Sequence, residues 1–157
     1  MQRISTCLWF DDQAQEAAVF YVGIFPNSRI IDTKYYLEGS PRPSGSVLIV
    51  QFMLDGTEYT ALNGGPHYKF SPAMSLVANC DTQDEVDTLW RTLCEGGQEG
   101  QCGWLTDKFG VSWQIVPRAV LKLLNTADRA ASQRAFSAMM KMTKLDIAAL
   151  ERAYQNA

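Results

Sequence analysis

The sequence predicts an α+β fold built from two copies of one strand–helix–strand unit, followed by a helical extension. Residues 5–13 and 75–83 share one pattern, an apolar strand, an acidic turn and a helix start, at an offset of about 70 positions. In each copy a helix, a glycine-rich break and further strand follow. We expect such a duplication to place a pocket between its copies. The predicted boundaries are a single domain at 1–157, with one module at 1–66, a second at 72–117 and C-terminal helices at 118–157.

The first module begins with β-branched and aromatic residues at 4–10, which predict a strand. Asp11 or Asp12 can cap the helix that follows. Alanine and aromatic residues at helical spacing continue that helix to a stop at Phe25–Pro26. Asp55–Gly56 is a tight hairpin signal. Three further strands are predicted, at 29–36, 46–54 and 57–62.

The second module repeats the order, with a strand at 74–80 and a helix that starts at Asp81–Thr82. Gly96–Gly97 should end this helix. Residues 100–104 predict a loop leading into a strand. A hairpin follows at 107–110, and we expect Asp107 and Lys108 to lie in solvent at its tip. The last strand runs over 111–116, before Pro117.

The C-terminal segment has helical rather than strand periodicity. A short helix is predicted near 121–124, a longer one at 128–144, and a final one capped by Asp146. These amphipathic pieces need an apolar partner, either the sheet of their own chain or a second subunit. We expect a homodimer.

Composition narrows the function classes. A net charge of −3 over 157 residues argues against nucleic acid as a partner, and no apolar stretch is long enough for a bilayer. The N-terminal residues lack a signal-peptide pattern, so a cytoplasmic location is expected. The four cysteines form no C-x-x-C pair; buried free thiols are the simplest reading, with zinc binding or a nucleophile as alternatives. We expect solvent to reach Cys102 alone.

Six segments of the chain carry a resemblance to known proteins: Leu8–Asp11, Phe20–Tyr21, Phe25–Ser28, Thr60–Pro66, Cys102–Gln114 and Lys141–Glu151. With them the chain resembles the vicinal oxygen chelate superfamily, which includes glyoxalase I, extradiol dioxygenases and bleomycin-resistance proteins. The closer resemblance is to the PhnB-like family, also labelled "3-demethylubiquinone-9 3-methyltransferase domain". This resemblance implies two βαβββ modules, each rolling its sheet into a half-open cup.

Metal enzymes of this superfamily place histidines or carboxylates on the first and last strands of each module, where they bind a divalent ion. The matching positions here are Ser5, Ser75 and Gln114, with either Thr60 or Asn63 as the fourth. These side chains are neutral and would hold such an ion poorly. We therefore predict no metal and no cofactor.

Other residues are candidates for a ligand pocket. Strand alternation puts Ser5, Cys7 and Trp9 on one face, so Trp9 should line the first cup, whereas Trp113 should lie in the core. Phe70 is a further aromatic candidate, with core packing as the alternative for each aromatic. Glu58, on the face of Thr60, and His67, the sole histidine, are the ionisable candidates for catalysis. For His67, a plain surface position and a pocket-rim position remain open.

Three functions are consistent with these observations. The first is binding of a small organic molecule in a metal-free pocket. The second is a lyase or isomerase with a non-standard site, and the third is an interaction protein that uses its C-terminal helices. Whether the chain is an enzyme stays open. Methyl transfer is disfavoured, because the loop after Phe10 lacks the glycines of a methyl-donor site.

Overall fold

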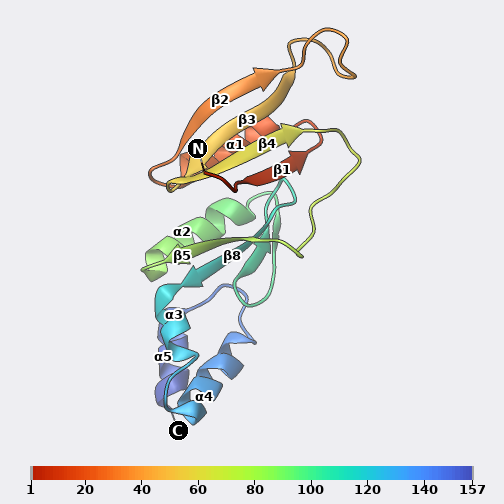
Figure 1. Ribbon diagram of the computed structural model, residues 1–157. Helices are drawn as coiled ribbons and strands as arrows, with labels where there is room; N and C mark the ends of the chain where they lie inside the picture. The colour runs from red at the N-terminus through yellow and green to blue at the C-terminus, as the bar shows by residue number, and fades with distance from the viewer. Residues whose placement is uncertain (1, 157) are drawn as a thin grey trace. The chain divides into compact units, whose positions relative to one another are not determined.

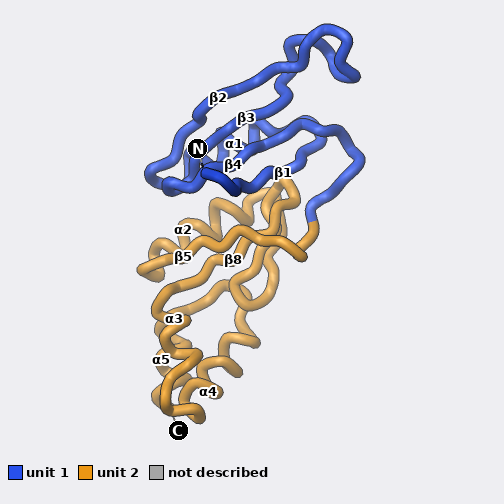
Figure 2. The backbone as a smooth tube through the Cα atoms, viewed as in Figure 1, with its two compact units in different colours: residues 1–70 blue, residues 71–157 orange. Residues whose placement is uncertain are grey.

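The computed structural model describes residues 2–156. They form two compact units, divided between Phe70 and Ser71 and coloured separately in Figure 2. Each unit contains one four-stranded sheet. The order in the first is β1 (Thr6–Phe10), β4 (Thr57–Asn63), β3 (Val47–Leu54) and β2 (Arg29–Tyr35), as labelled in Figure 1. The order in the second is β5 (Leu76–Cys80), β8 (Ser112–Pro117), β7 (Trp104–Thr106) and β6 (Gln98–Glu99). In both, the first strand pairs in parallel with the last, and the other pairs are antiparallel. This shared topology confirms the predicted α+β fold with two βαβββ modules.

Unit 1 has a sheet with one face packed against a single helix. Leu8 and Phe10 of the first strand are buried, while Cys7 between them is exposed, as alternation predicts. The helix contributes Tyr21, whose ring stacks on Phe52 with centroids 6.4 Å apart. The elements are β1 (Thr6–Phe10), α1 (Ala14–Ile24), β2 (Arg29–Tyr35), β3 (Val47–Leu54) and β4 (Thr57–Asn63).

The start of α1 corrects one prediction. Neither Asp11 nor Asp12 caps the helix; Gln13 occupies the N-cap position and, within the described residues, its side chain makes no capping bond. Instead, the Oδ1 atom of Asn63 accepts a hydrogen bond of 2.8 Å from the Ala14 amide. A buried residue 49 positions further along therefore caps the helix. Sequence rules that look for caps beside the helix could not find it.

Unit 2 repeats the arrangement with shorter strands. Thr82 caps the helix by accepting a hydrogen bond from the Glu85 amide, as the sequence predicts. The two-residue strand 98–99 is one that the sequence does not reveal, because it is too short to show alternation. The elements are β5 (Leu76–Cys80), α2 (Gln83–Cys94), β6 (Gln98–Glu99), β7 (Trp104–Thr106) and β8 (Ser112–Pro117).

The hairpin between β7 and β8 corrects a second prediction. Asp107 is 3% exposed rather than solvated, although Lys108 beside it is exposed. Its Oδ1 atom accepts hydrogen bonds from the amides of Phe109 and Val111, and its Oδ2 atom accepts one from the indole of Trp113. Trp113 is itself buried, as predicted. The carboxylate thus organises the turn and fixes the tryptophan on the next strand.

The C-terminal helices pack mainly on one another within unit 2. Leu145, Leu150 and Val120 form a small buried core among them. Asp128 and Asp146 cap the second and third helices through side-chain oxygens. The helices are α3 (Arg118–Leu123), α4 (Arg129–Met139) and α5 (Ile147–Gln155).

The predicted helix 128–144 is wrong in its end, because α4 stops at Met139. Beyond it the chain turns so that the carbonyls of Met142 and Thr143 accept hydrogen bonds from the amides of Cys102 and Gly103, at 2.8 and 2.7 Å. A helix could not present these two carbonyls sideways to another segment, because its carbonyls point along its axis. Tertiary pairing therefore overrides a sequence of good helix formers.

The structure also bears on membrane association. Among the helices of residues 2–156, none is both long and apolar enough to cross a membrane.

Candidate functional site

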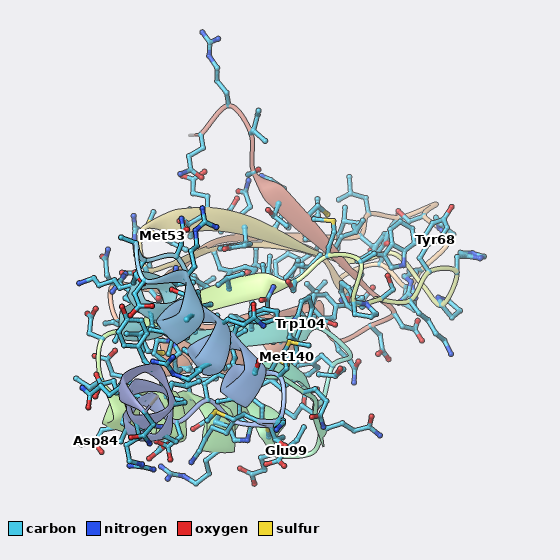
Figure 3. All side chains as sticks on the ribbon, turned by 90° about the horizontal axis from the view of Figure 1, so that it is seen from below. Met53, Tyr68, Asp84, Glu99, Trp104 and Met140 are labelled. Carbon is cyan, nitrogen blue, oxygen red and sulfur yellow. The ribbon has the colours of Figure 1, made fainter. Side chains whose placement is uncertain are left out.

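Unit 2 contains a cavity of about 600 Å³ between its sheet and its C-terminal helices. This volume lies in the usual range for small-molecule sites. Trp104 and Met140, both labelled in Figure 3, belong to its lining. The full lining is Gln101, Cys102, Trp104, Gln114, Val116, Val120, Leu121, Leu124, Met139, Met140 and Leu145. None of these described lining residues carries a charged side chain.

Strand alternation builds the floor of this cavity. Trp104 of β7 lies opposite Gln114 of β8, and both belong to the lining. The alternate residues, Leu105, Trp113 and Ile115, are buried. Consecutive residues of a strand point to opposite faces of the sheet. One face of the second sheet therefore packs in the core, while the other presents an indole and an amide to the cavity.

Gln114 is hydrogen-bonded to a second predicted site residue. Its Nε2 atom donates to the Oγ atom of Ser75, at 3.0 Å. Ser75 precedes β5, and β5 pairs with β8 in parallel, so the pairing of the strands brings the two side chains together. The amide oxygen and the second N–H of Gln114 provide one acceptor and one donor beyond this bond. The pair is a neutral hydrogen-bonding group at an apolar wall.

The equivalent positions in unit 1 follow from the register. Cys7 pairs with Thr60 in β4, and Val77 pairs with Gln114 in β8. Cys7 and Val77 occupy the same place in the repeat, so Thr60, rather than Asn63, is the counterpart of Gln114. Glu58 lies two residues earlier on the face of Thr60, and is half-buried. Ser5 is exposed just before β1.

Asn63 lies on the face of β4 opposite Thr60, in the last residue pair between β1 and β4. It is 5% exposed and pairs with Phe10. While its Oδ1 atom accepts from Ala14, its Nδ2 atom donates to the Val47 carbonyl at 3.1 Å. Both ends of the amide are thus used to tie α1 and β3 to β4.

Trp9 lies against the loop after β4. Its indole N–H donates to the Gly65 carbonyl at 2.9 Å, and its ring meets Tyr68 edge-on at 5.0 Å. A Cβ atom on Gly64 would lie 2.3 Å from the Trp9 ring, so this close approach requires glycine. Trp9 is half-buried, and contacts with the loop as well as its place in β1 fix its position.

His67 and Phe70 are the remaining predicted site residues of unit 1. His67 is exposed in the loop. Phe70 is half-buried, and its ring meets Phe10 edge-on at 5.2 Å. Phe10 is a buried residue of the sheet. Neither His67, Phe70 nor Glu58 contributes to the cavity of unit 2.

The residues at the superfamily's metal positions do not fit a divalent ion. Ser5, Thr60, Ser75 and Gln114 offer hydroxyl and amide oxygens without negative charge, and the last two already bond to each other. Hard divalent ions need carboxylates, and borderline ones need imidazole or thiolate. Within residues 2–156, no group of three or more His, Cys, Asp or Glu side chains is arranged to hold a metal.

The four thiols differ in burial. Burial raises the pKa of Cys80 to about 11, with the Glu85 carboxylate adding to the effect, and burial raises the pKa of Cys94 to about 11 as well. Cys7, with a pKa also raised by burial, is nevertheless exposed, and Cys102 is half-buried. The expectation that solvent reaches Cys102 alone is therefore wrong. The apolar strand around Cys7 suggests a buried thiol, but the Cys7 side chain lies on the exposed face of β1, opposite the buried Leu8.

The sequence did not single out most of the cavity lining. Trp104 stands out in the sequence as an aromatic residue with core packing as its default, and the alternation that it shares with Gln114 across the hairpin accounts for its place in the lining. The contributions of Leu121, Met139 and Met140 could not be predicted, because they depend on how the helices return to the sheet. Helical periodicity predicts an apolar stripe without its partner.

The chain matches one protein family and several solved structures. A family model described as 3-demethylubiquinone-9 3-methyltransferase matches residues 2–116. A solved structure described as a putative 3-demethylubiquinone-9 3-methyltransferase, PhnB protein, from Bacillus cereus is 35% identical, with a TM-score of 0.69. It is covered over 99% of its length by 74% of this chain. The comparison with curated proteins found no match.

Two more distant structures are similar in fold. One, from Pseudomonas aeruginosa, is 20% identical with a TM-score of 0.61, covering 74% of this chain and 98% of its own. The other is the fosfomycin resistance protein FosX from Listeria monocytogenes, which is 11% identical with a TM-score of 0.50. The match covers 82% of this chain and 97% of FosX. At these identities they support the fold alone. The family match ends before α3, so it excludes the segment 141–151 that carried part of the resemblance.

Proposed function

Because this chain belongs to the family described as 3-demethylubiquinone-9 3-methyltransferase, within the vicinal oxygen chelate superfamily, we propose that it binds a small organic molecule without a metal ion. The observation that carries the proposal is the cavity of unit 2. It combines a mostly apolar lining with two neutral polar side chains, Gln101 and Gln114, and Gln114 is held by its hydrogen bond to Ser75. Small-molecule sites commonly have this composition.

The chemistry of the lining favours binding over catalysis. General acid–base catalysis needs a titratable group within hydrogen-bond reach of the substrate. Among the described residues that line the cavity, Cys102 is the sole ionisable side chain. Glu58 and His67 belong to unit 1 and line no part of this cavity. We therefore place the ligand in unit 2 and assign it no reaction.

The family description names a methyl transfer, which we do not propose for this chain. A typical methyl-donor site has a glycine-rich loop after the first strand of a doubly wound sheet. Here residues 11–13, between β1 and α1, are Asp, Asp and Gln, and each unit has four strands with the order first, last, third, second. These features supply no comparable site.

A neutral aromatic probe tests the proposal. N-phenyl-1-naphthylamine fluoresces in apolar surroundings and carries one N–H, which the Gln114 amide oxygen can accept. We expect saturable binding of about one probe per chain, and a loss of roughly tenfold in affinity for Gln114→Leu, the usual value of one hydrogen bond. The measurement is a fluorescence titration, with calorimetry for stoichiometry.

Gln133→Leu is the matched control, because Gln133 is an exposed glutamine of α4 outside this cavity. It should bind the probe like the unmodified protein. If the unmodified protein shows no saturable binding, or if the two variants behave alike, the ligand does not occupy this site.

The proposal includes a homodimer in the cytoplasm. Ile30, Ile31 and Tyr35 are exposed on β2, which is an edge strand of its sheet. Exposed apolar edges favour association with another chain. We expect light scattering to give the mass of two chains, and Ile31→Lys to give the mass of one. An unmodified protein that stays monomeric at high micromolar concentration contradicts the dimer.

A further inference from the structure

The wall of the cavity opposite the sheet comes from the C-terminal extension. Six of its residues lie at or beyond position 120: Val120, Leu121, Leu124, Met139, Met140 and Leu145. The family match ends at residue 116. The Bacillus cereus relative is covered over 99% of its length by 74% of this chain. The wall therefore lies outside the segment on which family membership rests.

Specific bonds fix the wall to helix α2 and to the loop before β7. The Gln83 side chain donates from Nε2 to the Leu145 carbonyl at 3.0 Å and accepts at Oε1 from the Ile147 amide at 2.8 Å. Lys144 and Asp87 form an ion pair at 2.8 Å. These contacts add to the backbone bonds that 102–103 donate to 142–143. Such anchoring, just after Met139 and Met140 in the chain, fixes this segment relative to α2 and to the loop before β7.

The side chains of the wall indicate what it accepts. Leucine, valine and methionine make dispersion contacts without directional demands, and methionine adapts to aromatic surfaces. Trp104 supplies an aromatic face across the cavity. The described lining has no charged group to balance a charge on the ligand. Burying an unpaired charge is costly, so charged ligands are disfavoured.

We propose that the extension selects the ligand: its six lining residues form a specificity wall that admits an uncharged aromatic molecule and excludes its charged analogues, with Met140 at the mouth. The proposal rests on the proposed function and deepens it. Met140 is 52% exposed, so its side chain borders both the cavity and solvent. A charge placed there should change which ligand binds, because Coulomb interactions act over a few ångströms at a partly buried position.

The test uses the full chain and two probes that differ by one group. N-phenyl-1-naphthylamine is neutral, and 8-anilinonaphthalene-1-sulfonate adds a sulfonate to the same scaffold. We expect the unmodified protein to prefer the neutral probe by at least about tenfold, and Met140→Lys to shift this preference toward the sulfonate by about tenfold or more. Phe136→Lys is the control, since Phe136 is 43% exposed on α4 and lies outside this lining.

Alkylation locates the probe independently. With iodoacetamide and peptide mass spectrometry, saturating neutral probe should slow modification of Cys102, which lines the cavity, by about fivefold or more. Modification of Cys7, exposed in unit 1, should be unchanged. Urea unfolding of both lysine variants checks that they fold as the unmodified protein does.

Each outcome decides a separate point. Absence of probe binding by the unmodified protein removes the proposed function, and the specificity wall with it. Binding that is weakened by Gln114→Leu, while Met140→Lys equals Phe136→Lys, keeps the function and overturns the wall. Equal affinity of the unmodified protein for both probes overturns the selection of uncharged ligands. Protection of Cys102 together with the shift at Met140→Lys supports both proposals.

Discussion

Replacing Asp107 with alanine should lower the free energy of unfolding by about 3–4 kcal/mol, because hydrogen bonds to a charged acceptor contribute roughly 1.5–3 kcal/mol each and buried donors would be left unpaired. The amides of Phe109 and Val111 and the indole of Trp113 all donate to this carboxylate. The carboxylate is 3% exposed, so water could not replace it without opening the hairpin. Urea denaturation followed by tryptophan fluorescence measures the loss.

Asparagine variants provide the graded comparison for this prediction. Asp107→Asn keeps one oxygen as an acceptor but turns the other into a donor that opposes the Trp113 indole, so it should lose about half as much stability. Asp55→Asn is the control, since Asp55 is an exposed residue of the β3–β4 turn with a positive φ of 45°, which asparagine also tolerates. If Asp107→Ala is no worse than Asp55→Asn, the carboxylate is not the centre of the turn.

Replacing Gly103 with alanine should cost about 2–4 kcal/mol, the sum of a left-handed backbone and an overpacked contact. Gly103 has φ of +83°, and a Cβ atom there would lie 2.9 Å from the Ile115 carbonyl oxygen and 3.1 Å from Leu145. The Gly103 amide also donates to the Thr143 carbonyl at 2.7 Å. The substitution therefore strains the contact between the sheet and the extension.

The matched control is Gly23→Ala. Gly23 lies within α1, and a Cβ atom there would meet nothing within 4 Å. Alanine should stabilise the protein by roughly 0.5–1 kcal/mol, because glycine is a poor helix residue. Denaturation midpoints give both values. Weakened probe binding should accompany Gly103→Ala alone; equal stability of the two variants would show that the contact at Gly103 tolerates a side chain.

The sequence was sufficient for much of the fold. The repeat of 5–13 at 75–83, the Asp55–Gly56 turn, the helix start at Thr82 and the cap at Asp146 are local signals, and each corresponds to an observed feature. Local signals suffice where a residue interacts with its neighbours in the chain.

The failures share a physical cause. Asn63 caps a helix 49 positions away. The helix α4 ends at Met139 because the carbonyls of the following residues Met142 and Thr143 accept hydrogen bonds from Cys102 and Gly103. Asp107 is buried because Trp113 folds back onto it. Each depends on a specific contact that composition and periodicity do not specify: between distant segments in the first two cases, and within one hairpin for Asp107, which lies six residues from Trp113. The same holds for the cavity, where the sequence identified Gln114 and Ser75 but not the helices facing them.

The parallel pairing of each unit's first and last strands has a consequence for synthesis on the ribosome. β1 cannot find its partner until β4 has been made, and β5 must likewise wait for β8. Until then the N-terminal strand keeps unpaired backbone groups on both sides, a state that invites aggregation. If translation slows after Asn63, β1 has time to pair with β4 before the second unit is made. The similar strands of the second unit then cannot pair with β1 in place of β4.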